Sequence, residues 1–161
     1  MNQFLHKIRV EWLVTVFCAW HSADLVSAWK HAPYDHFGWL ALLIWVIPAL
    51  WSIAHRAHDI YQFKLAAISL TVALIGVIGD LNFLVYWGLA GALGSLAQFR
   101  PLSAWPWLAL AMCWMPVFGW LLGTRLHLTP TPVNVLRVAI ALVAAVIGWR
   151  RLVVRRPGPA A

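Results

Sequence analysis

The sequence predicts an all-α fold, a polytopic bundle of about six transmembrane helices with the N- and C-termini in the cytoplasm. Of the 161 residues, 63% are hydrophobic and only 11% are charged, and the mean hydropathy is +0.77. Soluble domains carry roughly 25% charged residues, and a soluble chain of this size leaves much of its surface in water. Lipid is therefore the solvent that fits. The 12 tryptophans also suit the headgroup level of a bilayer, where amphipathic rings collect.

Six apolar runs approach the length of roughly 20 residues that a helix needs to cross a bilayer. The first is the least regular because His21 and Asp24 interrupt it, and the second contains Pro48, which predicts a kink. The last begins at Thr131 and Pro132, where threonine can cap a helix and proline suits its first position. The third and fourth runs are short enough to be re-entrant, so a count of five stays open. We expect one integral membrane domain over residues 1–161, with a basic cytoplasmic tail at 153–161 and spans near 12–29, 38–54, 65–79, 83–97, 105–122 and 132–152.

The distribution of lysine and arginine predicts the orientation. With the N-terminus inside, nine of the 12 cations fall on inner segments and three on outer segments, as the positive-inside rule requires. Four of the nine follow the last apolar run, where they would anchor the chain against anionic lipid: Arg150, Arg151, Arg155 and Arg156. The other basic residues are scattered singly between apolar runs, so the formal charge of +7 does not indicate nucleic acid as a partner.

Small residues recur at four-residue spacing in the fourth apolar run, at Gly88, Gly91, Ala92 and Ser95. Small side chains let helix backbones approach closely in lipid. This face is expected first to serve helix packing. We also expect the Gly88/Ala92/Ser95 region to mediate association with another membrane protein or with a second copy of the chain.

Polar side chains collect on the outer side of this topology. Ionisable groups at membrane depth are costly and usually pair or line a polar cavity. Asn134 and Arg137 are three residues apart and share a helix face, and Arg137 lies about one turn inside the last run, so Asp24 or Asp80 is expected to pair with it. The cluster either pins helices together or forms a binding or catalytic site that opens outward. Its expected members are His21, Asp24, His31, Asp35, His36, Asp80, Asn82, Arg125, His127, Asn134 and Arg137.

The sequence predicts no metal site and specifies no cofactor. Its only cysteines, Cys18 and Cys113, lie inside apolar runs and form no CxxC pair. Imidazole is a common ligand of haem and of metals, but most of the seven histidines fall in loops or at the ends of apolar runs. Gly-rich phosphate loops and the HExxH and GxSxG motifs do not occur.

Two polar stretches resemble segments of a known membrane-protein family. Residues 29–39 read WKHAPYDHFGW, and residues 134–138 read NVLRV. The first is similar to the outer loop after the first span of the exosortase/archaeosortase family of membrane thiol transpeptidases, and the second resembles the segment that carries that family's catalytic arginine. The resemblance implies an outward-facing enzyme with Cys113 as nucleophile, Arg137 as oxyanion or cation partner and His127 as base, since a thiolate needs a base or a cation to activate it.

The chain departs from this family's pattern at two of the three catalytic elements. Cys113 sits in Met-Cys-Trp-Met, where the family has Ala-Cys-Ser-Gly, and no histidine follows Arg137. The leading hypothesis is therefore a non-catalytic accessory, assembly or scaffold subunit of a larger system in the cell (inner) membrane. The alternatives are the exosortase-like transpeptidase or peptidase and a small-solute or proton-coupled carrier that uses Asp24, Asp80 and Arg137. The lipid bilayer and another membrane protein are the expected partners.

Overall fold

The computed structural model describes residues 10–55, 60–96 and 105–154. Within these ranges the chain forms helices joined by short connections, so the prediction of an all-α fold is confirmed. The basic tail from residue 155 onward, with Arg155 and Arg156, lies outside the described residues. In chain order the elements are α2 (Val10–His21), α3 (Asp24–His31), the 3-10 turn η1 (Pro33–Asp35), α4 (Gly38–His55), α5 (Ile60–Ile78), α6 (Asn82–Leu96), α7 (Trp105–Trp114), α8 (Pro116–Arg125) and α9 (Pro130–Val154).

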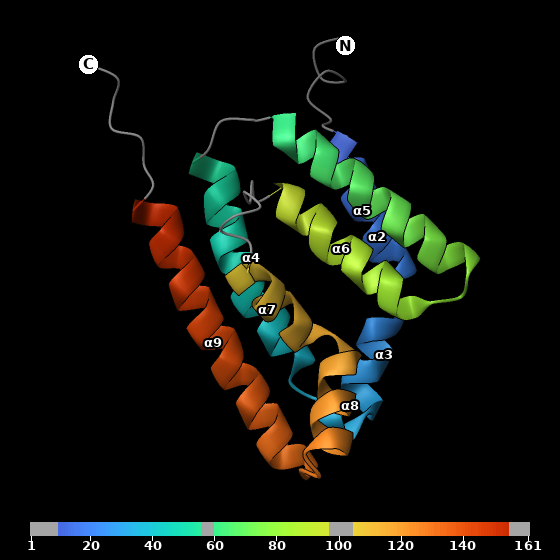
Figure 1. The fold of residues 1–161 in the computed structure, drawn as a ribbon, viewed down its shortest axis with the longest axis vertical. Coiled ribbons are helices and arrows are strands. Elements are labelled where there is room, and N and C mark those ends of the chain that lie inside the picture. The colour runs from blue at the N-terminus through green and yellow to red at the C-terminus, as the bar shows by residue number, and fades with distance from the viewer. Residues whose placement is uncertain (1–9, 56–59, 97–104, 155–161) are drawn as a thin grey trace.

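The helices pack as two groups, with a shorter layer at one end. Helices α2, α5 and α6 pack against one another, and α4, α7 and α9 form the second group. Helices α3 and α8 and the turn η1 pack together, and α8 and η1 also contact α9. Figure 1 shows this shorter layer at the lower end of the molecule, where α9 begins, while α2 begins and α9 ends toward the opposite end.

Hydropathy and length identify few complete spans among the described helices. One helix, over Pro130–Arg150, is long and apolar enough to cross a bilayer by itself. Pro106–Trp114 and Pro116–Arg125 would form a second span only if the bent pair is counted as one. Phe63–Ile78 and Asn82–Leu96 are apolar but shorter.

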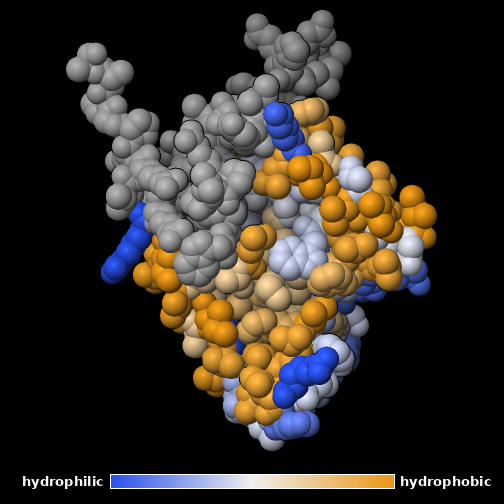
Figure 2. All heavy atoms as spheres, viewed as in Figure 1, coloured by the Kyte–Doolittle hydropathy of each residue, from blue (hydrophilic) through white to orange (hydrophobic). Residues whose placement is uncertain are grey.

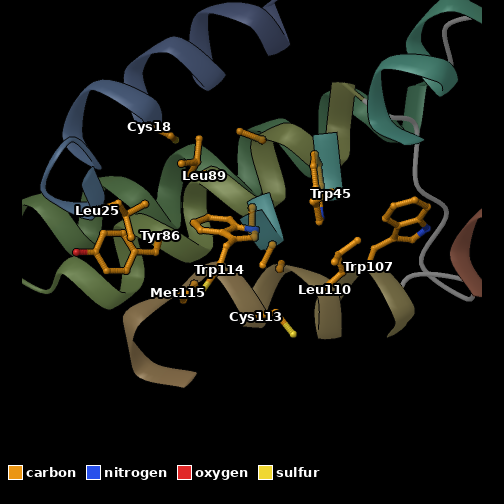
Figure 3. Packing of buried hydrophobic residues seen from close by; sticks show 14 of the residues in the cluster. Cys18, Leu25, Trp45, Tyr86, Leu89, Trp107, Leu110, Cys113, Trp114 and Met115 are labelled. Carbon is orange, nitrogen blue, oxygen red and sulfur yellow. The ribbon is translucent and has the colours of Figure 1, made fainter. Parts of the chain in front are cut away.

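Buried aromatic and aliphatic side chains join the two groups of helices. Trp114 is fully buried and extends toward α6, where Tyr86 and Leu89 lie (Figure 3). Trp45 of α4 packs edge-on against Trp107 of α7, with ring centroids 6.2 Å apart and planes at 78°. Such edge-to-face pairs add attraction between the rings beyond the burial of their area. The core thus fixes α7 between α4 and α6.

The first predicted span is two helices, α2 and α3, separated at Ser22 and Ala23. The Ser22 hydroxyl donates to the Cys18 carbonyl at 2.8 Å, and the Leu25 amide donates to the Ser22 carbonyl in a tighter turn. A serine hydroxyl that bonds back to the preceding turn bends a helix. The expected single helix over 12–29 is therefore interrupted near its middle.

The fifth predicted span is also broken, at Met115, and α7 and α8 meet at an angle of 84°. Pro116 disfavours helical geometry for the residue before it, and Met115 is extended, with φ −81° and ψ 143°. Pro116 then occupies the first turn of α8, where its missing N–H is not needed. The predicted run at 105–122 is a bent pair of helices for this reason.

The small residues of α6 pack within the chain, against α5. A Cβ on Gly88 would lie 2.6 Å from the Ala73 Cβ, and one on Gly91 would lie 2.2 Å from the Ser69 hydroxyl. Ala92 and Ser95 are fully buried. These residues therefore serve helix packing within the chain, with α5 in close contact at Gly88 and Gly91. Association of the Gly88/Ala92/Ser95 region with another protein or a second copy stays a prediction.

Gly88→Leu tests the close approach of α5 and α6. The added side chain has no room beside Ala73 and Ser69, and overpacking typically costs about 1–3 kcal/mol of stability. We expect a lower thermal unfolding midpoint in detergent micelles than for Ala67→Leu, a matched change at an exposed position of α5. Equal midpoints for the two variants would contradict the packing described.

Candidate functional site

The first turns of α9 hold the loop that links α3 to α4. The Asn134 side-chain amide donates to the Pro33 carbonyl at 2.8 Å, and its side-chain oxygen accepts from the Phe37 amide at 3.5 Å. Asn134 is itself buried. One side chain of α9 therefore binds the backbone at the first residue of η1 and just after η1, and holds this turn against the helix.

Arg137 lies one turn further along α9 and is fully buried. Its NH2 group donates to the Tyr34 carbonyl at 3.1 Å and forms an ion pair with the Asp35 carboxylate. Asp35 is 5% exposed. A buried guanidinium is costly unless it is paired and hydrogen-bonded, and η1 supplies both a carboxylate and a carbonyl. We call Asp35, Asn134 and Arg137, with the backbone of residues 33–37, the α9–loop site.

Two glycines let neighbouring helices reach the ion pair. A Cβ on Gly119 of α8 would lie 2.4 Å from the Asp35 Oδ1 and 2.5 Å from the Arg137 NH2. A Cβ on Gly38, the first residue of α4, would lie 2.8 Å from the Arg137 NH1 and closer still to the Trp29 ring. Helices α4, α8 and α9 thus meet around one guanidinium.

The break between α7 and α8 is tied to the same region. In an unbroken helix the Trp114 carbonyl would accept from the Phe118 amide, but that amide donates to Met115 instead. The Trp114 carbonyl accepts from the Trp29 indole N–H at 3.0 Å. Trp29 therefore satisfies a carbonyl that the helix break releases, as a buried backbone acceptor requires.

Burial and the opposite charges of Asp35 and Arg137 act against each other at the site. Burial raises the pKa of the Asp35 carboxyl above its ordinary value, and the charge and hydrogen bond of Arg137 oppose that rise. The Phe118 ring lies 5.8 Å from the guanidinium carbon of Arg137, within the range of a cation–π contact. Among the residues that the structure describes, the Arg137 Nε and NH1 groups have no hydrogen-bond partner.

The predicted partners of Arg137 were wrong, because Asp35 takes that position. Asp24 instead accepts a hydrogen bond from the Tyr86 hydroxyl of α6. Asp80 is exposed at the turn between α5 and α6, and Figure 1 shows that turn on the opposite side of the molecule from α9. The expected cluster of Asp24, Asp80 and Arg137 at one depth is not formed.

Of the predicted outer polar cluster, the structure brings together only Asp35, Asn134 and Arg137. His31 is exposed and bonds locally to Ser27, and His21 packs on Phe17 with ring centroids 4.6 Å apart. The remaining predicted members are exposed and lie on other elements: His36 after η1, Asp80 and Asn82 at the start of α6, and Arg125 and His127 at the end of α8.

The three residues that the family resemblance implies as catalytic lie on different elements. Cys113 lies on α7 and is fully buried, and Arg137 lies on α9. The Cys113 thiol donates to the Ala109 carbonyl at 3.2 Å, and its side chain points away from Trp114 (Figure 3). His127 is exposed beyond α8 in a left-handed conformation with φ 51°, and no bond joins it to Cys113 or Arg137 in the described structure.

Within the described ranges, no three histidine, cysteine, aspartate or glutamate side chains come together as metal ligands. Comparisons with protein-family models, with curated proteins and with solved structures found no match. The interpretation of the site therefore depends on its own geometry. In that geometry, helices α4, α8 and α9 and the loop at residues 33–37 pack around the buried guanidinium of Arg137.

Sequence reasoning missed Trp29, Gly38, Gly119 and Tyr86 as parts of the polar interior. Trp29 and Gly38 lie within the WKHAPYDHFGW run. The sequence indicated that this run matters, but not that Trp29 would bind the Trp114 carbonyl or that Gly38 would lie beside Arg137. Gly119 carries no sequence signal of its own. Its importance comes from a contact between elements that lie far apart in the chain.

A double-mutant cycle on Arg137 and Asp35 tests the structural role of the ion pair. Arg137→Met leaves a buried carboxylate alone and Asp35→Asn leaves a buried guanidinium alone, and breaking one partner of a buried pair typically costs about 3–5 kcal/mol. The double variant removes both charges, so we expect it to be more stable than the sum of the single effects. Unfolding in mild detergent measures the cycle, and strictly additive effects would contradict a direct pair.

Proposed function

We propose that this chain is a small multi-pass membrane protein that acts as a non-catalytic accessory or assembly subunit of a larger membrane system. In this proposal six segments cross or enter the bilayer of the cell (inner) membrane, and two of them are the bent pairs α2–α3 and α7–α8. The N- and C-termini lie in the cytoplasm. Exposed apolar surface, the positions of the helix ends and the burial of the α9–loop site support it.

The described surface carries large apolar side chains on helices throughout the molecule. Trp20 of α2 is 79% exposed and Ile78 of α5 is 84% exposed. Helix α9 adds Val135, Leu142, Val143 and Val146. Figure 2 shows hydrophobic residues across most of one face, with hydrophilic residues toward its margins. Exposed apolar surface this continuous marks an interface with lipid or protein.

The positions of the helix ends support an even number of crossings. Helix α2 begins and α9 ends toward the same end of the molecule (Figure 1). Helix α5, which carries Lys64 in its second turn, begins at this end as well. A concentration of lysine and arginine at this end agrees with a cytoplasmic location.

The observation that supports the non-catalytic proposal most strongly is the burial and pairing of Arg137. Its side chain is 0% exposed, and its NH2 group already binds Asp35 and the Tyr34 carbonyl. A catalytic cation must reach a reacting group in a substrate, and here helices α4, α8 and α9 enclose it. We therefore propose that Arg137 fastens the outer layer of the protein and takes no part in chemistry.

Descent from an exosortase-like ancestor is a second proposal, supported by one contact. The two stretches that resemble the family, residues 29–39 and 134–138, bind each other through Asn134 and Arg137. In this proposal the chain keeps the contact between the loop and the arginine-bearing helix of such a site, but it has no accessible nucleophile and no histidine beside Arg137.

Isolation of the tagged protein from membranes in mild detergent tests the accessory role. We expect a second membrane protein to co-purify in a fixed ratio, because an assembly subunit needs a partner to act on. The same isolation after Gly88→Leu serves as a control in which the fold is weakened and the ratio falls. Recovery of this chain alone from native membranes would contradict the proposal.

Cys113→Ala distinguishes the accessory role from thiol chemistry. Because Cys113 is fully buried, we expect the variant to reach the membrane and bind its partner as the wild type does. We also expect a membrane-impermeant maleimide to leave Cys113 unlabelled, whereas a cysteine introduced as His127→Cys, at an exposed position, is labelled from outside. A thiol-dependent transpeptidase or peptidase activity that is lost in Cys113→Ala would support the exosortase-like enzyme instead.

A further inference from the structure

An apolar groove lies between α7 and α9 and begins within one turn of Arg137 along α9. It has a volume of about 250 Å³, and its lining contains no charged side chain. The residues that form it are Ala109, Ala139, Ile140, Val143, Ala144 and Ile147. Three alanines among six lining residues leave a channel where larger side chains would close the surface.

The groove follows the axis of α9 toward its basic end. From Ala139 to Ile147 it extends about 12 Å, at about 1.5 Å per residue. One leaflet of a bilayer contributes about 15 Å of hydrocarbon, so the groove fits within a single leaflet. Arg150 follows Val143 by seven residues and therefore lies on the same face of the helix. Its side chain is exposed.

We propose that this groove holds an acyl chain of an anionic phospholipid, and that Arg150 binds the phosphate of its headgroup. The charge complementarity is local, because the apolar groove ends one turn before an exposed guanidinium. Arg151 is the next residue of the same helix, and Arg155 and Arg156 follow it in the sequence. Basic sites beside transmembrane helices on the cytoplasmic side bind anionic headgroups in this way.

Trp107 of α7 packs on α9 near the end of the groove that is nearest Arg150. A Cβ on Gly148 would lie 2.9 Å from the Trp107 ring, so the indole packs directly on the backbone of α9. Trp107 is 3% exposed and is held by Trp45 on its other side. The groove therefore keeps its shape between two packed helices. The inference rests on the proposed membrane location and does not depend on the accessory role.

Native mass spectrometry of the full chain in mild detergent tests the proposal, with phosphatidylglycerol or phosphatidylcholine of the same acyl chains as probes. We expect preferential retention of phosphatidylglycerol. Arg150→Gln should weaken that retention about fivefold, the effect of one basic residue near an anionic headgroup. Arg125→Gln, at an exposed position on the opposite end of the molecule, should leave it unchanged.

A second variant tests the groove itself. Ala139→Trp fills the groove from an exposed position, and we expect it to reduce retention of both lipids, whereas Ala19→Trp on α2 should not. Equal retention of the two lipids by the wild type, or wild-type retention in Ala139→Trp, would overturn the proposal. A dimer that Ala139→Trp abolishes would assign the groove to a second copy and overturn it as well. If the protein co-purifies with a protein partner but shows no lipid preference, the lipid proposal is wrong and the accessory proposal stands.

Discussion

The buried pair of Arg137 and Asp35 is the interaction on which the rest of the structure depends. A guanidinium that is 0% exposed must be neutralised and hydrogen-bonded inside the protein. The chain meets this requirement at the NH2 group by folding the loop at residues 33–37 onto α9, where Asn134 fixes the backbone on both sides of Asp35. Gly38 and Gly119 then let α4 and α8 close around the charge. One cation thereby joins the loop and α4 to α8 and α9, two parts of the chain that are about 100 residues apart in the sequence.

The two broken helices follow the same logic. A helix break releases backbone polar groups, and buried groups of this kind need partners within the protein. At Met115 and Pro116 the released Trp114 carbonyl accepts from Trp29, which lies at the end of α3 beside the loop. At Ser22 the hydroxyl binds the carbonyl of the preceding turn. Each break therefore places a short helix, α3 or α8, against the α9–loop site. The bent pairs are part of how the site is enclosed.

Hydropathy located three helices to within a few residues, because a run of apolar side chains bounded by Gly, Pro or charge is a local signal. Helices α4, α6 and α9 correspond closely to the predicted runs at 38–54, 83–97 and 132–152. The choice of partner for Arg137 could not be predicted in this way, since Asp24, Asp35 and Asp80 all lay on the same predicted side. Asp35 could be identified as the partner of Arg137 only from the conformation of η1, and Asn134 holds that conformation through its contacts with the loop. The small residues of α6 gave a similar ambiguity, because spacing shows that a helix can approach closely but not which helix does so.

Amide hydrogen exchange of the protein in mild detergent tests the central claim most directly, because it measures how firmly each segment is held in the folded state. If Arg137 fastens the loop to α9, Arg137→Gln will speed exchange at residues 34–38 by a large factor while α5 and α6 exchange as in the wild type. Unchanged protection at residues 34–38 in that variant would show that the loop is held by other contacts. The account of the site as a structural fastening would then be wrong.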